Sequence, residues 1–239
     1  MLRDPDASLK TKDFRTIYGI IRHLLGETGK DTSLSDAFLN WFALIMQRKA
    51  KPITAWVLHG CEGTGKGYFY NKIAAPLLSP KNTSSITVSS IEENFNGWIE
   101  GKLFILVDEV DVDDFKDKGK VAAKLRNAIT EPTIPLRRMR QATIDAPNYA
   151  SFIFSSNRPQ PVYIPPTDRR YNVGNYQPKK LAPPDDNTVT SELEKFAEWL
   201  LAHKADVDYA NQIIQTEARD LIQKLGVSSV QETCNAIKD

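Results

Sequence analysis

The chain has 239 residues, of which 41% are hydrophobic and 26% charged, and this length and composition suit one folded core with attached helices. A formal net charge of +1 excludes a protein coated in positive charge, although it is compatible with a local basic patch. No apolar run is long enough to span a membrane, and the first residues lack the apolar core of a signal peptide. The two cysteines, Cys61 and Cys234, are too few for a disulfide framework, so we expect a cytoplasmic protein.

The first 50 residues are predicted to form two helices. Apolar residues recur with helical spacing over residues 8–25, and a second helix is predicted to begin near Ser33 or Ser35 and to end near Arg48. Its large aromatic residues include Trp41 and Phe42. We interpret this segment either as an oligomerisation collar or, at Trp41 and Phe42, simply as core.

From residue 53 onward, short apolar runs alternate with helical stretches, which predicts an α/β fold with a parallel sheet. The predicted strands are 53–58, 86–88, 103–107, 152–154 and 171–173. The basic residues 48–51 in front of them are interpreted as a solvated linker. A proline-rich loop, 178–186, leads into two or three closing helices. The predicted parts are therefore an N-terminal helical segment (1–50), a core (51–178) and a C-terminal helical segment (179–239).

A glycine-rich stretch, HGCEGTGKG at residues 59–67, follows the first predicted strand and precedes a helical stretch. It matches the phosphate-loop pattern GxxxxGK in its required strand–loop–helix setting. Backbone N–H groups of such a loop surround a phosphate, and its lysine reaches the β- and γ-phosphates. The candidate phosphate-binding residues are Gly60, Gly63, Thr64, Gly65, Lys66 and Gly67. The alternative is a glycine-rich turn with a chance lysine.

Gly67 departs from this pattern, because a serine or threonine usually follows the lysine and binds Mg²⁺ through its hydroxyl. Tyr68 is one residue too late and too bulky for that role. Magnesium would then depend on the nucleotide, water and acidic residues, or on Thr64.

Two acids, Asp108 and Glu109, directly follow the predicted strand 103–107. A buried strand that ends in two carboxylates suits nucleotide hydrolysis: the first acid holds Mg²⁺ through water, and the second polarises the attacking water. The alternative is a strand followed by a solvated acidic loop, to which we assign Asp111, Asp113 and Asp114.

Polar and basic residues also follow the predicted strand 152–154. Asn157 is placed to bind the γ-phosphate or the attacking water, because ligands of parallel sheets bind at the carboxyl ends of strands. The alternative role is that of a turn cap. Further along, Arg169 or Arg170 is a candidate arginine finger, and the alternative is a surface ion pair with Asp168.

A basic segment, 133–144, lies between the acid pair and Asn157, and its short apolar runs flank a tip formed by Arg137, Arg138, Met139 and Arg140. The pattern predicts a hairpin. Arginines pair with phosphates without regard to sequence, and a methionine can pack on a sugar or base, so the tip is a candidate DNA contact. The alternative is an exposed hairpin with ordinary solvated charges.

The order GCEGTGKG, LFILVDE, FIFSSN and DRR resembles the superfamily 3 helicase core of phage, plasmid and viral replication proteins. It is most similar to the helicase part of phage and mobile-element primase–polymerases. NFNGW at 94–98 and the stretch 124–133 are also similar to that family, and the resemblance covers residues 53–175.

The resemblance implies an AAA+-like P-loop NTPase that forms a ring, commonly a hexamer, and uses ATP and Mg²⁺ to move along single-stranded or forked DNA. It assigns phosphate binding to the loop and Lys66, Mg²⁺ to Asp108 and water activation to Glu109. It makes Asn157 the γ-phosphate sensor, one of the two arginines the finger, and the basic hairpin the DNA grip. A linked primase or polymerase domain and a bacterial host cytoplasm follow if the chain is encoded by a phage or plasmid.

The leading hypothesis is therefore an ATP-driven DNA helicase. The alternative is an ATP-dependent replication initiator or loader without processive unwinding. A third class, a small-molecule kinase, lacks a convincing acceptor site among the predicted helices.

Overall fold

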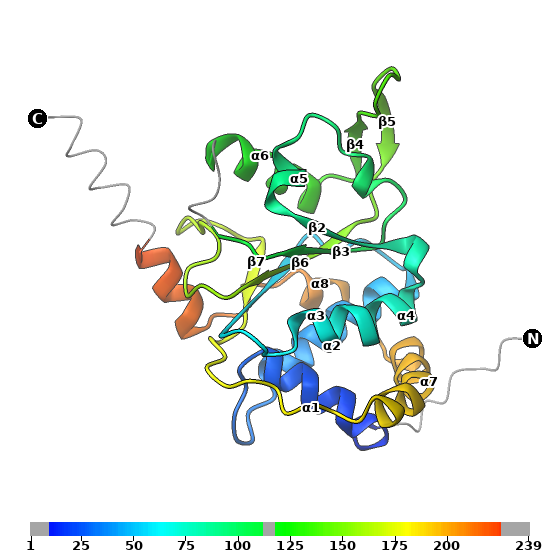
Figure 1. Ribbon diagram of the computed structural model, residues 1–239, viewed down its shortest axis with the longest axis vertical. Helices are drawn as coiled ribbons and strands as arrows, with labels where there is room; N and C mark the ends of the chain where they lie inside the picture. Colours follow the sequence, from blue (N-terminus) through cyan, green and yellow to red (C-terminus); the bar gives the residue numbers. More distant parts are fainter. Residues whose placement is uncertain (1–9, 112–117, 226–239) are drawn as a thin grey trace, which may run out of the picture.

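The protein was analysed as a computed structural model that describes residues 10–111 and 118–225, so Cys234, Asp113 and Asp114 lie outside the described residues. Its centre is a five-stranded parallel sheet with the strand order β2-β3-β6-β1-β7 (Figure 1). The strands of this sheet are β1 (Ala55–His59), β2 (Thr83–Thr87), β3 (Phe104–Asp108), β6 (Ser151–Ser156) and β7 (Tyr171–Val173). An antiparallel pair, β4 (Thr133–Leu136) and β5 (Ile144–Pro147), stands apart from it. The predicted parallel α/β fold is confirmed.

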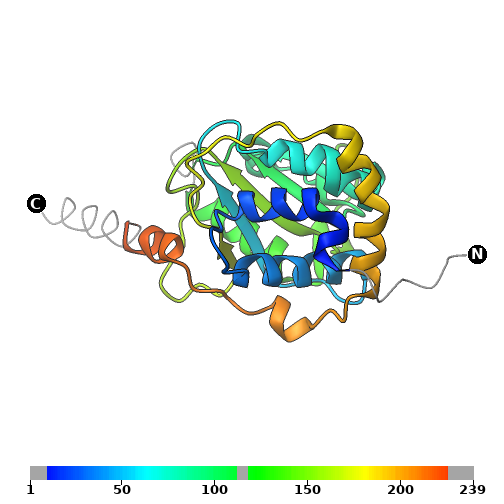
Figure 2. The same cartoon turned by 90° about the horizontal axis from the view of Figure 1, so that it is seen from below.

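Helices cover both faces of the sheet (Figures 1 and 2). They are α1 (Arg15–Leu24), α2 (Ser33–Gln47), α3 (Lys66–Phe69), α4 (Ala75–Leu78), α5 (Val88–Glu92), α6 (Lys118–Thr130), α7 (Asp186–Ala202) and α8 (Val207–Ala210). Shorter helical turns are η1 (Thr11–Phe14), η2 (Tyr70–Ala74), η3 (Pro80–Asn82) and η4 (Gly97–Ile99), and residues 217–225 are helical. None of the described helices is both long enough and apolar enough to cross a membrane.

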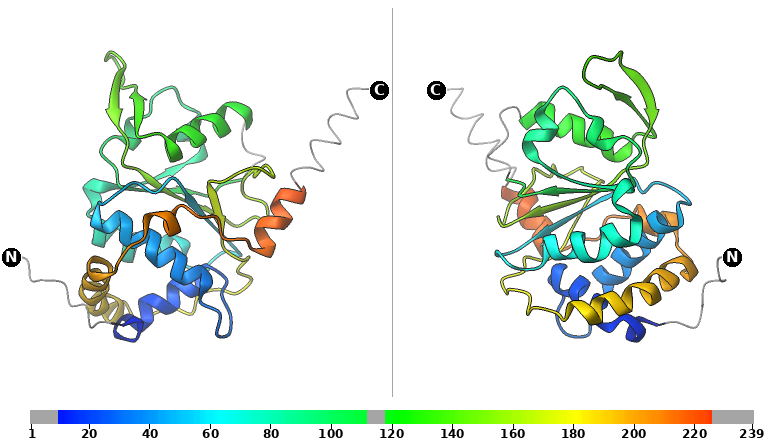
Figure 3. Two further views of the ribbon diagram at one scale, coloured as in Figure 1. Left: turned by 180° about the vertical axis from the view of Figure 1, so that it is seen from behind. Right: turned by 45° about the vertical axis from the view of Figure 1, so that its right-hand side comes forward.

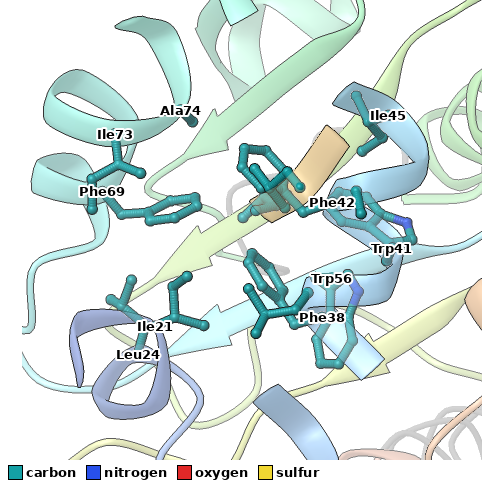
Figure 4. Close-up of a cluster of buried hydrophobic side chains, with 14 of the residues drawn as sticks. Ile21, Leu24, Phe38, Trp41, Phe42, Ile45, Trp56, Phe69, Ile73 and Ala74 are labelled. Atoms are coloured by element: carbon teal, nitrogen blue, oxygen red, sulfur yellow. The ribbon is translucent and has the colours of Figure 1, made fainter. Parts of the chain in front are cut away.

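One face of the sheet is covered by α1, α2, α3, α4 and α7, and its core is rich in aromatic rings (Figures 2 and 4). Phe38 of α2 meets Trp56 of β1 edge to face, with ring centroids 5.3 Å apart. Trp41 and Phe42 are fully buried there, so they are core residues. Replacing such a ring by alanine typically costs about 3–5 kcal/mol. The oligomerisation collar stays a prediction for the rest of this segment.

The N-terminal and C-terminal helices pack together on that face. The carboxylate of Glu192 in α7 accepts hydrogen bonds from the backbone N–H groups of Thr16 (3.1 Å) and Ile17 (2.9 Å) in the first turn of α1. These N–H groups have no partner inside their own helix, so α7 provides the cap that α1 lacks locally. Both helical segments therefore belong to the same folded unit as the sheet.

The opposite face carries α5, α6 and the hairpin β4–β5 (Figure 3). Its core is mainly aliphatic, with Ile105, Val107 and Val121 among the buried residues. The hairpin extends away from the sheet beyond α5 (Figure 3). This face therefore joins the sheet to a projecting arm, whereas the other face is closed by long helices.

Three predictions need correction. Asp111 is not simply part of a solvated loop, because its carboxylate pairs with the guanidinium of Arg158 at 2.8 Å and its side chain is 17% exposed. The second strand begins at Thr83 rather than at residue 86, and Val88 opens α5, because an edge strand with one side-chain row exposed can contain polar residues. The residues 48–51 are not simply a solvated linker. Lys51 is largely buried, and its amine donates a hydrogen bond to the carbonyl of Ile129.

Candidate functional site

The glycine-rich loop follows the fully buried strand β1 and leads into α3, as predicted. Gly63 and Gly65 have φ angles of +78° and +90°, a region that favours glycine because it has no Cβ atom. Gly60 lies so close to a neighbouring segment that a Cβ atom would be 2.4 Å from the carbonyl oxygen of Gln177. The loop conformation thus requires glycine for two different reasons, curvature and close backbone approach.

Lys66 begins α3, and its amine is half-buried at the loop. The Nζ atom donates to Oδ1 of Asn157 (2.9 Å), to Oγ1 of Thr64 (3.0 Å) and to the backbone carbonyls of the loop (3.2 and 3.3 Å). Burial lowers the pKa of Lys66 from its ordinary value of 10.5, and the nearby acids act in the opposite direction. A cation that is partly removed from water and surrounded by oxygen atoms is well prepared to receive phosphate oxygens.

The acid pair lies at the carboxyl end of β3. Oδ1 of Asp108 accepts a hydrogen bond from the hydroxyl of Ser155 on β6 and another from the backbone N–H of Glu109 (3.0 Å). Glu109 is exposed and has a φ angle of +53°, a strained conformation for a residue other than glycine. The chain is held in this turn because Val110 donates its N–H to the carbonyl of Ser155 (2.8 Å). The fold therefore fixes Asp108 and leaves the Glu109 carboxylate open to solvent.

Strand β6 lies between β1 and β3, so its carboxyl end separates the phosphate loop from the acid pair. The register aligns His59 with Ser156 and Val107 with Phe154. A cavity of about 280 Å³ opens at this edge. Its lining residues come from the loop (62–68), the acid pair (Asp108 and Glu109) and the end of β6 (155–157). The structure thus brings Lys66, Asp108, Glu109 and Asn157 together in one cavity.

The hydroxyl groups near this cavity bear on how Mg²⁺ would be held. Thr64 is buried and its hydroxyl contacts the amine of Lys66, whereas Ser155 contacts Asp108. Gly67 offers no side chain. Among the described residues, no three His, Cys, Asp or Glu side chains form a group able to hold a metal. The donor set fits an ion held by one carboxylate, Asp108, together with phosphate oxygens and water.

Sequence reasoning missed Ser155 as the partner of Asp108, and it also missed the contact between the proline-rich loop and the phosphate loop. Leu181 of this loop donates its N–H to the carbonyl of Gly63 (2.9 Å), and Gln177, directly before the loop, accepts the N–H of Cys61 (2.9 Å). The composition of 178–186 correctly indicated a loop. It contained no signal for these backbone contacts, because a backbone hydrogen bond requires no particular side chain.

The two candidate arginines have different environments. The guanidinium of Arg170 pairs with the buried carboxylate of Asp168 at 3.1 Å, and this carboxylate also accepts the backbone N–H groups of Arg170 and Tyr171. Arg169 is exposed, and no ion pair joins it to another described residue. The ion pair with Asp168, which was the alternative to a finger role, thus forms at Arg170. Arg169 is left available to an external partner.

The basic segment forms the predicted hairpin, because β4 and β5 pair in antiparallel fashion. Arg137, Met139 and Arg140 are exposed at the tip, Met139 to 67%. The guanidinium of Arg138 instead pairs with the carboxylate of Glu100. This pairing holds the Arg138 guanidinium beside the body of the protein, and the other tip side chains remain free to reach outward.

Asn96 attaches the tip of the hairpin to the body of the protein. Its Oδ1 accepts the N–H of Arg137 (2.7 Å), and its Nδ2 donates to the carbonyl of Pro135 (3.0 Å). Asn96 belongs to the NFNGW stretch that the sequence singled out without a role. These hydrogen bonds give that stretch a structural role beside the hairpin.

The fold and the site define a parallel α/β protein whose phosphate-loop-like segment, acid pair and polar strand end meet at the carboxyl edge of the sheet. A family of unknown function (DUF5906) matches residues 58–170, the part of the chain that contains all of these groups. The DNA primase-polymerase of Nitratiruptor phage NrS-1 is 27% identical over 98% of this chain.

Solved apo structures of the NrS-1 C-terminal region share the fold, with TM-scores of 0.77 and 0.75 at 27% and 26% identity. They match 89% of this chain and 51% of theirs. The chain spans a third of the length of the curated relative, 33%. These similarities relate the chain to the C-terminal region of a phage replication protein.

Proposed function

We propose that the chain is an ATP-hydrolysing motor that moves on single-stranded DNA, a helicase of the superfamily 3 type. The observation that carries the proposal is the convergence of Lys66, Asp108, Glu109 and Asn157 at one cavity. An amine, two carboxylates and an amide around a phosphate loop are the groups that phosphoryl transfer to water requires. The relation to a phage primase–polymerase supports a role in DNA replication.

Each side chain has a distinct role in this proposal. The loop N–H groups and Lys66 bind the phosphates of ATP, and Asn157, hydrogen-bonded to Lys66, senses the γ-phosphate. Glu109 orients the attacking water and accepts its proton. Asp108 is the residue to hold Mg²⁺, which neutralises phosphate charge when it is bound. Ser155 keeps Asp108 oriented.

An exposed arginine suits catalysis between subunits. We propose that the chain assembles into a ring, commonly a hexamer in the resembled family, and that Arg169 of one subunit reaches the nucleotide of its neighbour. Arg169 is favoured over Arg170 because the Arg170 guanidinium is already paired with Asp168. Arginine fingers stabilise the charge that develops on the transferred phosphoryl group.

The basic hairpin is proposed to contact the DNA strand. Its exposed arginines are suited to phosphate contacts that are independent of sequence, which a translocating motor needs. The net charge of the chain is only +1, so the positive charge of this narrow arm is offset by acidic residues elsewhere in the chain. A linked primase or polymerase domain and the cytoplasm of a bacterial host complete the proposed setting.

The test is ATP hydrolysis with and without single-stranded oligonucleotide, followed by strand displacement on a fork and a measurement of mass in solution. We expect hydrolysis that DNA stimulates, and unwinding by an oligomer. Lys66→Ala removes the phosphate contact and should abolish hydrolysis. Lys72→Ala is the matched control, because Lys72 forms only an exposed ion pair with Asp186.

Two outcomes would change the proposal. Hydrolysis that DNA leaves unchanged under oligomer-forming conditions would rule out the motor. Hydrolysis stimulated by DNA without strand displacement would favour the initiator or loader.

A further inference from the structure

A second cavity, of about 550 Å³, lies at the opposite edge of the sheet from the phosphate loop. Leu103 and Ser151 border it at the amino ends of β3 and β6, and Arg48, Lys49 and Lys51 border it between α2 and β1. Pro132 and Tyr149 close it beside the base of the hairpin β4–β5. The cavity thus adjoins the same hairpin whose tip carries the exposed arginines.

Positive charge is concentrated around this cavity. Arg48 and Lys49 are exposed and form no ion pair with any described residue. The amine of Lys51 is largely buried against the carbonyl of Ile129, and burial lowers its pKa to about 8, against the opposing effect of Glu131. A largely buried amine gains more from an incoming anion than a solvated one does, because water screens it less.

A polar atom without a partner also borders the cavity. Ser151 is 1% exposed, and its hydroxyl forms no hydrogen bond with any described residue. The neighbouring Asn148 side chain, in contrast, donates to the carbonyls of Ala128 and Glu131 and accepts the N–H of Ala150. Buried hydroxyl groups normally have a partner, so Ser151 is a polar group at this edge whose hydrogen-bonding capacity the described residues leave unused.

The rest of the lining suits a flat apolar group. Tyr149 is 55% exposed and Ile53 39% exposed, and both border the cavity. A ring of Tyr149 beside cations can stack on a nucleobase while the cations bind its phosphate. A nucleotide unit combines these two chemical features.

We propose that this cavity binds a base-and-phosphate unit of single-stranded DNA, and that the same strand contacts the hairpin tip. The proposal rests on the proposed function and adds a second DNA contact to it. Each strand of the hairpin rises by about 14 Å from base to tip, at about 3.4 Å per residue, so a short strand can reach both sites. The tip then holds the strand, and the cavity at the base receives it.

The test is fluorescence anisotropy of a labelled oligothymidylate with the full chain, in the wild type and with the tip disabled by Arg137→Ala and Arg140→Ala. In both, Tyr149→Ala should weaken binding about fivefold or more, the usual effect of losing one stacked base. Tyr149→Phe keeps the ring and should keep the affinity. Lys49→Ala should reduce the slope of log affinity against log salt by about 0.7.

Lys195→Ala is the matched control for charge, because Lys195 is exposed on α7 and makes no contact with this edge. A photoreactive thymidine analogue in the oligonucleotide should cross-link to the peptide that contains Tyr149. The cavity proposal alone is overturned if the wild type binds DNA and the Tyr149 and Lys49 variants bind with unchanged affinity and salt slope. It is also overturned if these substitutions abolish binding of an acidic peptide and leave the binding of DNA unchanged. A wild type that binds no DNA would overturn the proposed function together with the cavity.

Discussion

The carboxyl edge of the sheet and the hairpin tip both carry charged side chains. Those at the carboxyl edge are held by hydrogen bonds, whereas those at the tip are exposed to solvent. At the carboxyl edge, the amine of Lys66 is held by Asn157 and Thr64, and Asp108 is held by Ser155. At the tip, Arg137 and Arg140 extend into solvent. Charges that stabilise a transition state must be fixed before the reaction, whereas charges that hold a passing strand must adapt to its backbone.

Two residues depart from this division. Glu109 is exposed although it belongs to the carboxyl edge, and its backbone has a positive φ angle of +53°. Arg138 is paired with Glu100 although it belongs to the tip. The comparison therefore predicts that reactions depend on the fixed groups and on Glu109, and that DNA affinity depends on the free arginines.

The largest effect is expected at the arginine that belongs to neither region. Arg169→Ala should lower ATP turnover by about 10³- to 10⁵-fold without lowering the melting temperature, since its side chain has no described ion pair to lose. Arg170→Ala should instead lower stability by about 1–3 kcal/mol, because it leaves the buried carboxylate of Asp168 with fewer partners. Turnover and thermal unfolding of both variants separate the two roles.

Mixing subunits tests the same arginine between neighbours. Arg169→Ala chains mixed with Lys66→Ala chains should regain part of the turnover, because some interfaces combine an intact Lys66 site with an intact Arg169. Mixtures no more active than either variant alone would place the finger within its own subunit or remove it.

The second effect concerns Glu109. Glu109→Gln keeps size and hydrogen-bonding capacity and removes the base, so turnover should fall by about 10²- to 10⁴-fold while ATP still binds. A fluorescent ATP analogue measures binding, and phosphate release measures turnover. Retained turnover would mean that another group activates the water. The carboxyl edge would then lack the catalytic base that we assign to it.

A smaller effect is expected at the hairpin. The double variant Arg137→Ala, Arg140→Ala should keep basal ATP turnover and lose about tenfold in DNA affinity at low salt, because two phosphate contacts disappear. Arg138→Ala should also keep basal turnover and lose DNA stimulation, but its loss of affinity should be the smaller one, because Arg138 is engaged by Glu100. If Arg138→Ala has the larger effect, DNA must displace Glu100 from Arg138.

The smallest effect is a pH dependence at Lys51. Burial lowers its pKa from 10.5 to about 8, so between these values the unfolded chain binds more protons and stability rises with pH. Lys51→Met removes this titration. The melting temperature of the variant minus that of the wild type should therefore fall as the pH rises from below 8 toward 10.5. A constant difference would mean that the amine is better solvated than its burial indicates.

The strand–loop–helix of the phosphate loop and the acid pair were predictable because each combines a buried apolar run with residues of special chemistry. Asn157 was predictable only as the polar end of a strand. Its contact with Lys66 follows from the insertion of β6 between β1 and β3, which no local pattern encodes.

Three features escaped prediction for physical reasons. Ser155 is an ordinary strand residue until the register places it beside Asp108. Asn96 holds the tip of the hairpin through backbone groups about forty residues away in sequence. Lys51 was predicted to be solvated because lysine is rarely buried. Its burial depends on a carbonyl of α6 that is distant in the sequence.

The segment that crosses the phosphate loop also affects how the loop should be studied. At Gly65 a Cβ atom would be 2.5 Å from Leu181, in addition to the strain of a φ angle of +90°. A substitution there would displace the Leu181 side chain and strain the backbone as well as disturb phosphate contacts, so an inactive Gly65 variant is not diagnostic of nucleotide binding. The amide of Leu181, hydrogen-bonded to Gly63, is a better reporter. Its rate of hydrogen exchange should slow when ATP stiffens the loop, which gives a readout in the unaltered protein.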